Sequence, residues 1–208
     1  AVGDGGVKFY TAPPMGRGRS SIARAHAELW ADAESRLYVA RRMYAIRFGE
    51  VLPRRDISAL RGMEGGRMKK LYEIMAQKYG VRWQGRRYDR REPESADLPN
   101  QAINHAATFV EAAGDIAVAA VGALPPLGFI HEDSSNAFTL DIADLWRAEL
   151  TLPLAFSVCA KVQRDPSLQL EREIRLEAAR WFRKLKLIPS MIDRIKELLN
   201  VNDDDSHS

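Results

Sequence analysis

The sequence predicts a mainly α-helical protein with one short strand near its N-terminus. Apolar residues recur at helical spacing from about Ser20 to Leu199, and residues typical of helix caps bound most of these stretches. The 208 residues have an ordinary globular composition, with 46% hydrophobic and 28% charged residues. A chain of this length buries enough surface to fold without disulfides.

The first 19 residues are predicted to be the remnant of a β-rich domain followed by a linker. Gly3–Gly6 indicates a turn, Val7–Thr11 alternates like a strand, and Pro13–Gly18 is typical of a linker. The sequence begins at Ala1, and the strand resembles the last strand of a domain that has already begun. We therefore expect that the front of a longer protein is missing.

Residues 20–200 are predicted to form one helical domain, which begins with a long helix from Ser20 to Phe48. Gly49 ends this helix, and its charged face carries five arginines: Arg24, Arg36, Arg41, Arg42 and Arg47. A second helix is expected from Asp56 to Tyr79, where Gly80 stops it.

Three glycines interrupt this second helix, and each costs about 1 kcal/mol relative to alanine. They are Gly62, Gly65 and Gly66, and Glu64 lies among them. The cost suggests that another backbone, or a ligand, comes very close there. Bare backbone beside Glu64 would let a large charged group approach this carboxylate, although an exposed helix glutamate is the simpler interpretation.

The second half of the chain is predicted to continue as helices. A polar loop at Val81–Leu98 precedes an Ala-rich helix that Pro99 opens. The small alanine side chains on the faces of this helix fit a buried, central position. The expected helices are Asn100–Gly122, Phe138–Arg164 with a kink or break at Pro153, Ser167–Leu187 and Pro189–Leu199. The acidic tail at 201–208 is expected to be disordered.

The cysteine content and the apolar stretches limit the class of protein. A single cysteine, Cys159, excludes an internal disulfide or a Cys-based zinc site and fits a reducing compartment, so we expect a cytoplasmic protein. Cys159 itself is expected in the core. The longest apolar stretches, Ile116–Ala123 and Leu150–Val158, are far shorter than the roughly 20 residues that span a bilayer. We therefore expect no membrane partner.

Two acids at helical spacing are the first candidates for chemistry. Asp141 and Asp144 lie three residues apart, on one face at the start of a helix. Taken alone, this spacing favours acids that cap free backbone N–H groups. With His131, ten residues upstream, the pair also makes a plausible divalent-metal set. His26 and His105 are expected to be helix-surface or packing residues.

Arginines are far more common than lysines in the basic clusters, and this preference favours contact with phosphates over a merely solvated surface. Arg61 and Arg67 flank the glycines around Glu64, while Arg172 and Arg175 lie on the expected Ser167–Leu187 helix. Acids on that helix make i,i+4 pairing on a solvated face the competing interpretation.

Several motifs occur in an order typical of one family. They are Leu60–Arg67 (LRGMEGGR), Tyr79–Val81, Gly85–Tyr88, Asn100–Gln101, Gly128–His131 and Asp141–Leu145. Together they resemble the CRISPR-associated spacer integrase ("Cas-one"), the catalytic subunit of the adaptation complex, and especially its type I-E branch. The similarity extends from about Gly6 to about Leu199.

The resemblance implies a small β-rich N-terminal domain and a large α-helical catalytic domain. It implies a homodimer, joined through a small partner subunit ("Cas-two") into an integration complex. The implied substrates are double-stranded DNAs, the spacer precursor and the CRISPR repeat. The implied activity is that of a metal-dependent endonuclease and integrase, which joins the 3′-hydroxyl ends of the spacer to the repeat by transesterification. A non-catalytic helical DNA-binding or adaptor module is the alternative.

The resemblance also implies a set of site residues. One divalent metal, Mg²⁺ or Mn²⁺, would be held by Glu64, His131 and Asp144, with Asp141 as a supporting acid. Arg172, Arg175 and Lys8 fall where basic residues contact DNA in the family. This sequence departs from the family at Glu132–Ser134, where relatives carry Thr-Gly-Lys or a similar run, and at Glu111, where some carry an aromatic residue.

Overall fold

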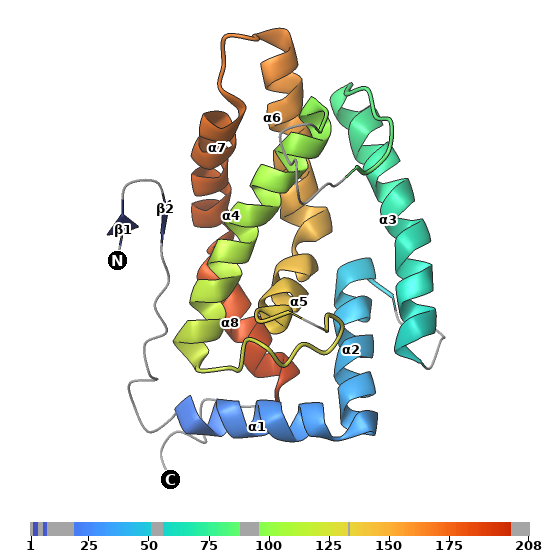
Figure 1. Ribbon diagram of the computed structural model, residues 1–208, viewed down its shortest axis with the longest axis vertical. Coiled ribbons are helices and arrows are strands. Elements are labelled where there is room, and N and C mark those ends of the chain that lie inside the picture. Colours follow the sequence, from blue (N-terminus) through green and yellow to red (C-terminus); the bar gives the residue numbers. More distant parts are fainter. Residues whose placement is uncertain are drawn as a thin grey trace.

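The computed structural model describes residues 2–3, 6–7, 19–50, 56–87, 96–132 and 134–200 (Figure 1). The helices in these ranges confirm the predicted mainly α fold, and none of them is long and apolar enough to cross a membrane. Their bounds are α1 Arg19–Ala31, α2 Ala33–Phe48, α3 Ile57–Tyr79, α4 Leu98–Val121, α5 Ala137–Leu145, α6 Leu152–Arg164, α7 Leu170–Leu185 and α8 Leu187–Leu198.

Two short strands precede the helices. Strands β1 (Val2–Gly3) and β2 (Gly6–Val7) pair antiparallel, with Val2 opposite Val7. The expected strand at Val7–Thr11 and the DNA-contact candidate Lys8 fall largely or wholly on residues 8–18, which lie outside the described residues. The predicted tail at 201–208 also lies outside them.

The expected single helix from Ser20 to Phe48 is instead two helices that run in different directions (Figure 1). Asp32 separates them: its backbone is extended, and its carboxylate accepts the Ser35 N–H at 2.8 Å, which caps α2. An aspartate that caps the next helix competes with continuation of the first, because its carboxylate satisfies a free N–H group.

Helix α4 lies at the centre of the bundle, as its small residues predicted (Figure 1). Asp97 caps its N-terminus, Gly122 ends it in the left-handed conformation, and it packs against α5, α6, α7 and α8. The contact face includes fully buried small residues, among them Ala102, Ala106 and Ala117. Small side chains let neighbouring backbones approach, so α4 serves as the axis on which the other helices pack.

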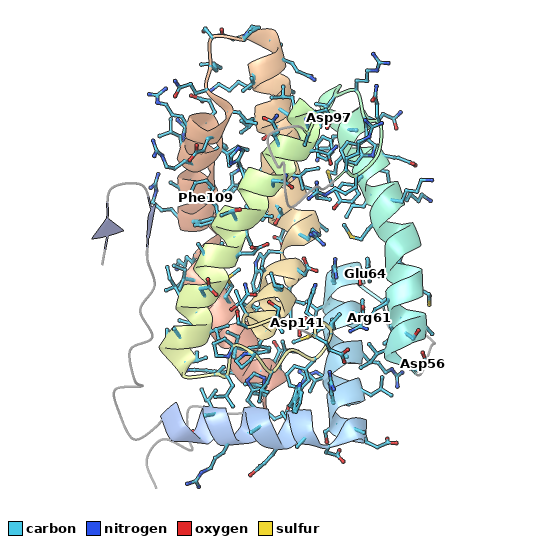
Figure 2. All side chains as sticks on the ribbon, in the orientation of Figure 1. Asp56, Arg61, Glu64, Asp97, Phe109 and Asp141 are labelled. Carbon is cyan, nitrogen blue, oxygen red and sulfur yellow. The ribbon has the colours of Figure 1, made fainter. Side chains whose placement is uncertain are left out.

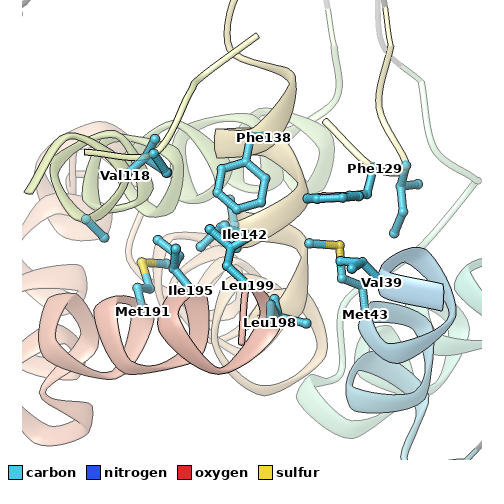
Figure 3. Close-up of a cluster of buried hydrophobic side chains, with 14 of the residues drawn as sticks. Val39, Met43, Val118, Phe129, Phe138, Ile142, Met191, Ile195, Leu198 and Leu199 are labelled. Carbon is cyan, nitrogen blue, oxygen red and sulfur yellow. The ribbon is translucent and has the colours of Figure 1, made fainter. Parts of the chain in front are cut away.

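Two hydrophobic clusters fill the bundle. One joins α2, α4, α5 and α8, and Figure 3 shows its Met43, Phe129, Phe138 and Met191 side chains. The other joins α3, α4, α6 and α7, and includes the buried Cys159, whose burial raises the pKa of its thiol to about 11. Phe48, Trp181 and Phe182 pack against both clusters and make them continuous.

The expected helix from Phe138 to Arg164 breaks before Pro153 rather than at it. Helix α5 ends at Leu145, a π-helical turn follows at Arg147–Thr151, and α6 begins at Leu152. Proline in the first turn of a helix has no N–H to leave unpaired, so Pro153 fits the start of α6. Single π-helical turns often occur at functional sites.

The segment between α4 and α5 is bound on one side by α1. His26 donates from Nε2 to the Leu127 carbonyl at 2.8 Å and accepts the Leu124 N–H at Nδ1, while Trp30 donates to the Gly128 carbonyl at 2.9 Å. Burial lowers the pKa of His26 to about 4, so the ring stays neutral and keeps one nitrogen as an acceptor. His26 is therefore a packing residue.

Gly128 allows this segment to lie against α5. A Cβ added there would meet the His131 carbonyl and would lie 2.7 Å from the Ala137 Cβ. We predict that Gly128→Ala lowers the free energy of unfolding by about 2 kcal/mol or more, because neighbouring backbone would have to move. Chemical denaturation followed by circular dichroism measures this change.

The matched control for this prediction is Gly62→Ala on α3, where an added Cβ would meet nothing within 4 Å. That change should raise stability by about 0.5–1 kcal/mol, since alanine favours the helix. Equal effects of the two substitutions would contradict the close approach assigned to Gly128.

Candidate metal and DNA site

The buried carboxylate of Asp141 organises the segment that carries His131. Its Oδ2 accepts the backbone N–H groups of Phe129 at 2.6 Å and Ile130 at 3.0 Å, and its Oδ1 accepts that of His131 at 2.9 Å. The same Oδ1 lies 2.7 Å from His131 Nδ1. Asp141 therefore fixes both the backbone and the ring of His131, as expected of a supporting acid.

The Asp141 contact decides which nitrogen His131 offers to a ligand. An ionised carboxylate can only accept, so Nδ1–H donates to Asp141 and Nε2 carries the lone pair of the neutral ring. Nε2 lies 3.9 Å from Asp144 Oδ2. This arrangement, a carboxylate behind an imidazole, is the one that orients histidine ligands of metals.

The pKa of His131 is raised above its ordinary value of 6.5. Burial alone favours the neutral ring and lowers the pKa, but the hydrogen bond to Asp141 and the charges of Asp141, Asp144 and Glu64 outweigh it. The protonated His131 ring therefore stabilises the fold below pH 6.5, and this contribution to stability is lost as the pH rises through the raised pKa.

Glu64 is fixed by two side chains of α2. Tyr44 donates its hydroxyl to Oε2 at 2.9 Å, and Arg47 Nη1 lies 2.6 Å from Oε1. Burial and the nearby Glu64 carboxylate raise the pKa of Tyr44, so it stays a neutral donor. Figure 2 shows Glu64 and Arg61 on α3, on the side that faces α2.

The Arg47 guanidinium joins the two candidate acidic ligands. Its Nη1 also lies 3.3 Å from Asp144 Oδ2, and its side chain is only 2% exposed. Arg147, in the π-helical turn, lies 3.2 Å from Asp144 Oδ1. Arg47, which the sequence placed on the charged face of its helix, is instead buried, because its partners come from α3 and α5. The sequence of α2 alone does not reveal these partners.

The structure thus brings the predicted ligands into one region without closing them around one point. His131 and Asp144 are neighbours, and Glu64 reaches Asp144 through Arg47. Among the described residues, no three metal-ligating side chains are close enough to hold an ion as they stand. The donor set still suits Mg²⁺ or Mn²⁺, because it offers two hard carboxylates and an imidazole nitrogen that Asp141 orients.

The site contains more polar and charged residues than the predicted set. Tyr44, Arg47 and Arg147 were missed, and only the spacing of Arg147 three residues after Asp144 could have indicated a contact. Glu111 lies near Asp144, and burial, followed by the Asp144 charge, raises the pKa of its carboxyl group. The departure noted at Glu111 therefore adds a carboxyl group beside the candidate ligands.

The described arginines of the predicted DNA-binding set fall into two groups. Arg61 donates to the Ile130 carbonyl, beside His131, and Arg67 pairs with Glu50 and lies over the Phe48 ring. Arg172 and Arg175 lie on α7 with exposed side chains. Arg61 is therefore the one in contact with the segment that carries His131.

The glycines of α3 leave open space beside Glu64. A Cβ added at Gly62, Gly65 or Gly66 would meet nothing within 4 Å among the described residues. The sequence suggested that these glycines admit either another backbone or a ligand. The first explanation is wrong for the described part of the chain, because no described segment comes close to them. Approach of a ligand stays a prediction.

We predict that Asp141→Asn lowers the pKa of His131 in metal-free protein, because the hydrogen bond to a carboxylate and its negative charge are both lost. NMR titration of the imidazole measures this change. Stability should fall by at least about 2 kcal/mol, since either orientation of the amide turns its NH₂ toward N–H donors. Asp193→Asn, an exposed change on α8, should alter neither quantity. An unchanged His131 titration in Asp141→Asn would contradict the assigned contact.

Comparison with known proteins places this geometry in a family. The family model described as "CRISPR associated protein Cas1" matches residues 23–177. The chain is 39% identical over 199 residues to the CRISPR-associated endonuclease Cas1 of Geobacter sulfurreducens, and 36% identical over 199 residues to that of Escherichia coli K12. Both matches cover 95% of this chain but 64% of the relative, so the chain spans about two thirds of their length.

A solved structure supports the same assignment. A crystal structure described as a TtCas1–DNA complex matches with a TM-score of 0.78 and 31% identity, and covers 86% of this chain and 65% of the other. The family match includes every residue of the candidate site, from Tyr44 to Arg147. The chain belongs to the CRISPR associated protein Cas1 family.

Proposed function

We propose that this chain is the catalytic part of a metal-dependent DNA endonuclease and integrase of CRISPR adaptation. Its reaction would be a transesterification that joins the 3′-hydroxyl ends of spacer DNA to the repeat. The observation that carries the proposal is the oriented pair of His131 and Asp141, with His131 Nε2 turned to Asp144 and Glu64 linked to Asp144 by Arg47. Relatives named CRISPR-associated endonuclease Cas1 support it.

Glu64, His131 and Asp144 would hold one Mg²⁺ or Mn²⁺ ion through their carboxylate oxygens and Nε2. When bound, such an ion neutralises charge that develops on a phosphodiester and favours the ionised form of an attacking hydroxyl. Nε2 can serve as a ligand only in the neutral ring, so the raised pKa of His131 means that protons compete with the metal ion more strongly than at an ordinary histidine.

The other side chains of the site keep the ligands in place. Asp141 holds the imidazole in one tautomer and fixes residues 129–131. Tyr44 directs the Glu64 carboxylate, and Arg147 directs that of Asp144. Open space along α3 leaves room for a DNA strand next to Glu64. These residues position the ligands and need not touch the reacting atoms.

The reaction requires no covalent intermediate between protein and DNA. The attacking group is the 3′-hydroxyl of the DNA, and the displaced group is the 3′-oxygen of the cut repeat strand. Two potential protein nucleophiles near the core are held in their protonated forms. Burial raises the pKa of the Cys159 thiol to about 11, and burial together with the Glu64 charge raises the pKa of the Tyr44 hydroxyl. A direct transfer between DNA strands fits these residues.

Double-stranded DNA, a Cas-two subunit and a second copy of the chain are the partners we propose. The structural likeness to a protein described in complex with DNA supports the first of these. The other two rest on the family resemblance. Arg61, Arg67, Arg172 and Arg175 are the described residues proposed to contact phosphates.

We predict that Glu64→Gln, His131→Ala and Asp144→Asn each lower strand joining by about 100-fold or more, because each removes a ligand of the ion. Asp141→Asn should lower it by about 10–100-fold. The assay follows a labelled spacer duplex joined to a plasmid that carries the repeat, with the Cas-two subunit and Mn²⁺ present.

Asp193→Asn on α8 is the control and should retain full joining activity. A wild-type chain that binds DNA without joining it would favour the adaptor alternative. Variants of the three ligands that join DNA as fast as wild type would contradict the assigned site.

A further inference from the structure

The carboxylate of Glu132 is held between two arginines from different helices. Arg36 of α2 donates from Nη2 to Glu132 Oε1 at 2.5 Å, and Arg61 Nη2 of α3 lies 3.5 Å from Oε2. Glu132 directly follows His131, so this pair of cations lies beside a candidate metal ligand. The three side chains make up what we call the Glu132 clamp.

Both arginines are fixed by contacts that do not involve Glu132. The Arg36 guanidinium lies 5.0 Å from the centre of the Trp30 ring, and Trp30 is itself bound to the Gly128 carbonyl. Arg61 donates to the carbonyl of Ile130. The two guanidinium groups would therefore stay in place if the carboxylate moved away, which leaves a preformed site for another anion.

The clamp is open to solvent on the side of Glu132 and Arg61. The Glu132 side chain is 45% exposed and that of Arg61 is 43% exposed, whereas that of Arg36 is 22% exposed. Exposed ion pairs are weak and are screened by salt, so the carboxylate can be displaced at little cost. Two guanidinium groups also form the same paired hydrogen bonds with phosphate oxygens as with carboxylate oxygens.

We propose that Arg36 and Arg61 form a binding site for one DNA phosphate, and that Glu132 fills this site while DNA is absent. The proposal rests on the proposed function as a DNA-binding enzyme. A strand that enters the site must displace the Glu132 carboxylate, so this side chain weakens binding at a point adjacent to His131. The glutamate at 132, one of the residues that depart from the family pattern, would thereby compete with the DNA backbone for the two arginines.

The test is DNA binding by Glu132→Gln, which keeps the shape of the side chain and removes its charge. Fluorescence anisotropy is measured with a duplex that carries single-stranded 3′ ends, in EDTA and over a range of NaCl concentrations. We expect about tenfold tighter binding than wild type, as for one gained charge-assisted contact. The slope of log affinity against log salt should steepen by roughly 0.7–0.9, the value for one phosphate.

Three further variants make the result specific. Asp193→Asn changes the net charge by the same amount on exposed α8 and should alter affinity by less than about twofold, since long-range charge effects are screened. Arg36→Gln in the Glu132→Gln background should remove the gain, because one of the two cations is then absent. Glu132→Ala should reproduce the gain, and thermal unfolding confirms that each variant is folded.

The outcomes separate this inference from the proposed function. If wild type binds DNA and Glu132→Gln gains no more affinity than Asp193→Asn does, the phosphate site is overturned and the DNA-binding function stays intact. A gain that persists after Arg36→Gln would also overturn it. Absence of DNA binding by every form would overturn both the site and the proposed function.

Discussion

The buried Arg47 guanidinium is the contact on which the arrangement of the candidate site depends. Glu64 on α3 and Asp144 on α5 are both largely shielded from water, and two such carboxylates repel each other unless a positive charge lies near both. Arg47 supplies that charge from α2, and so joins three helices at one point. Removing one member of a buried ion pair costs far more stability than the intact pair contributes, because the partner charge is left buried and unpaired. Arg47 therefore holds the two acids near each other and is in contact with both.

Asp141 performs a comparable task for the third candidate ligand. Its carboxylate accepts three consecutive backbone N–H groups and the imidazole N–H, so one buried acid sets both the path of the chain and the direction of the ring. The same segment is bound from the other side by His26 and Trp30 of α1. His131 Nε2 thus faces Asp144 because Asp141 holds the opposite nitrogen of the ring. Preorganisation of this kind keeps the entropy loss on ligand binding small.

Much of the fold could be predicted from the sequence because its signals are local. Asp56 and Gly80 bound α3 as expected, Gly122 ends α4 where the sequence predicted, and the alanines of α4 indicated its central position. The break at Asp32 was missed, because the apolar residues on both sides keep helical spacing. That pattern does not distinguish an aspartate inside one helix from an aspartate that caps a second. Arg47 could not be placed either: its partners lie 17 and 97 residues further along the chain, at 64 and 144, and only the tertiary fold brings them together. His131, Asp141 and Asp144 were first suggested by residue type and spacing, whereas Glu64 was assigned as the third ligand through the family motifs.

The central claim is that these three residues form one divalent-metal site, in which a metal ion and Arg47 compete for the same carboxylates. A crystal structure determined with Mn²⁺, with anomalous scattering measured at the manganese edge, tests it most directly. We expect one anomalous peak about 2.0–2.3 Å from a Glu64 oxygen, an Asp144 oxygen and His131 Nε2, with the Arg47 guanidinium moved away from at least one carboxylate. A structure with no peak at this position, or with a bound ion that leaves His131 uncoordinated and both Arg47 contacts unchanged, would contradict it.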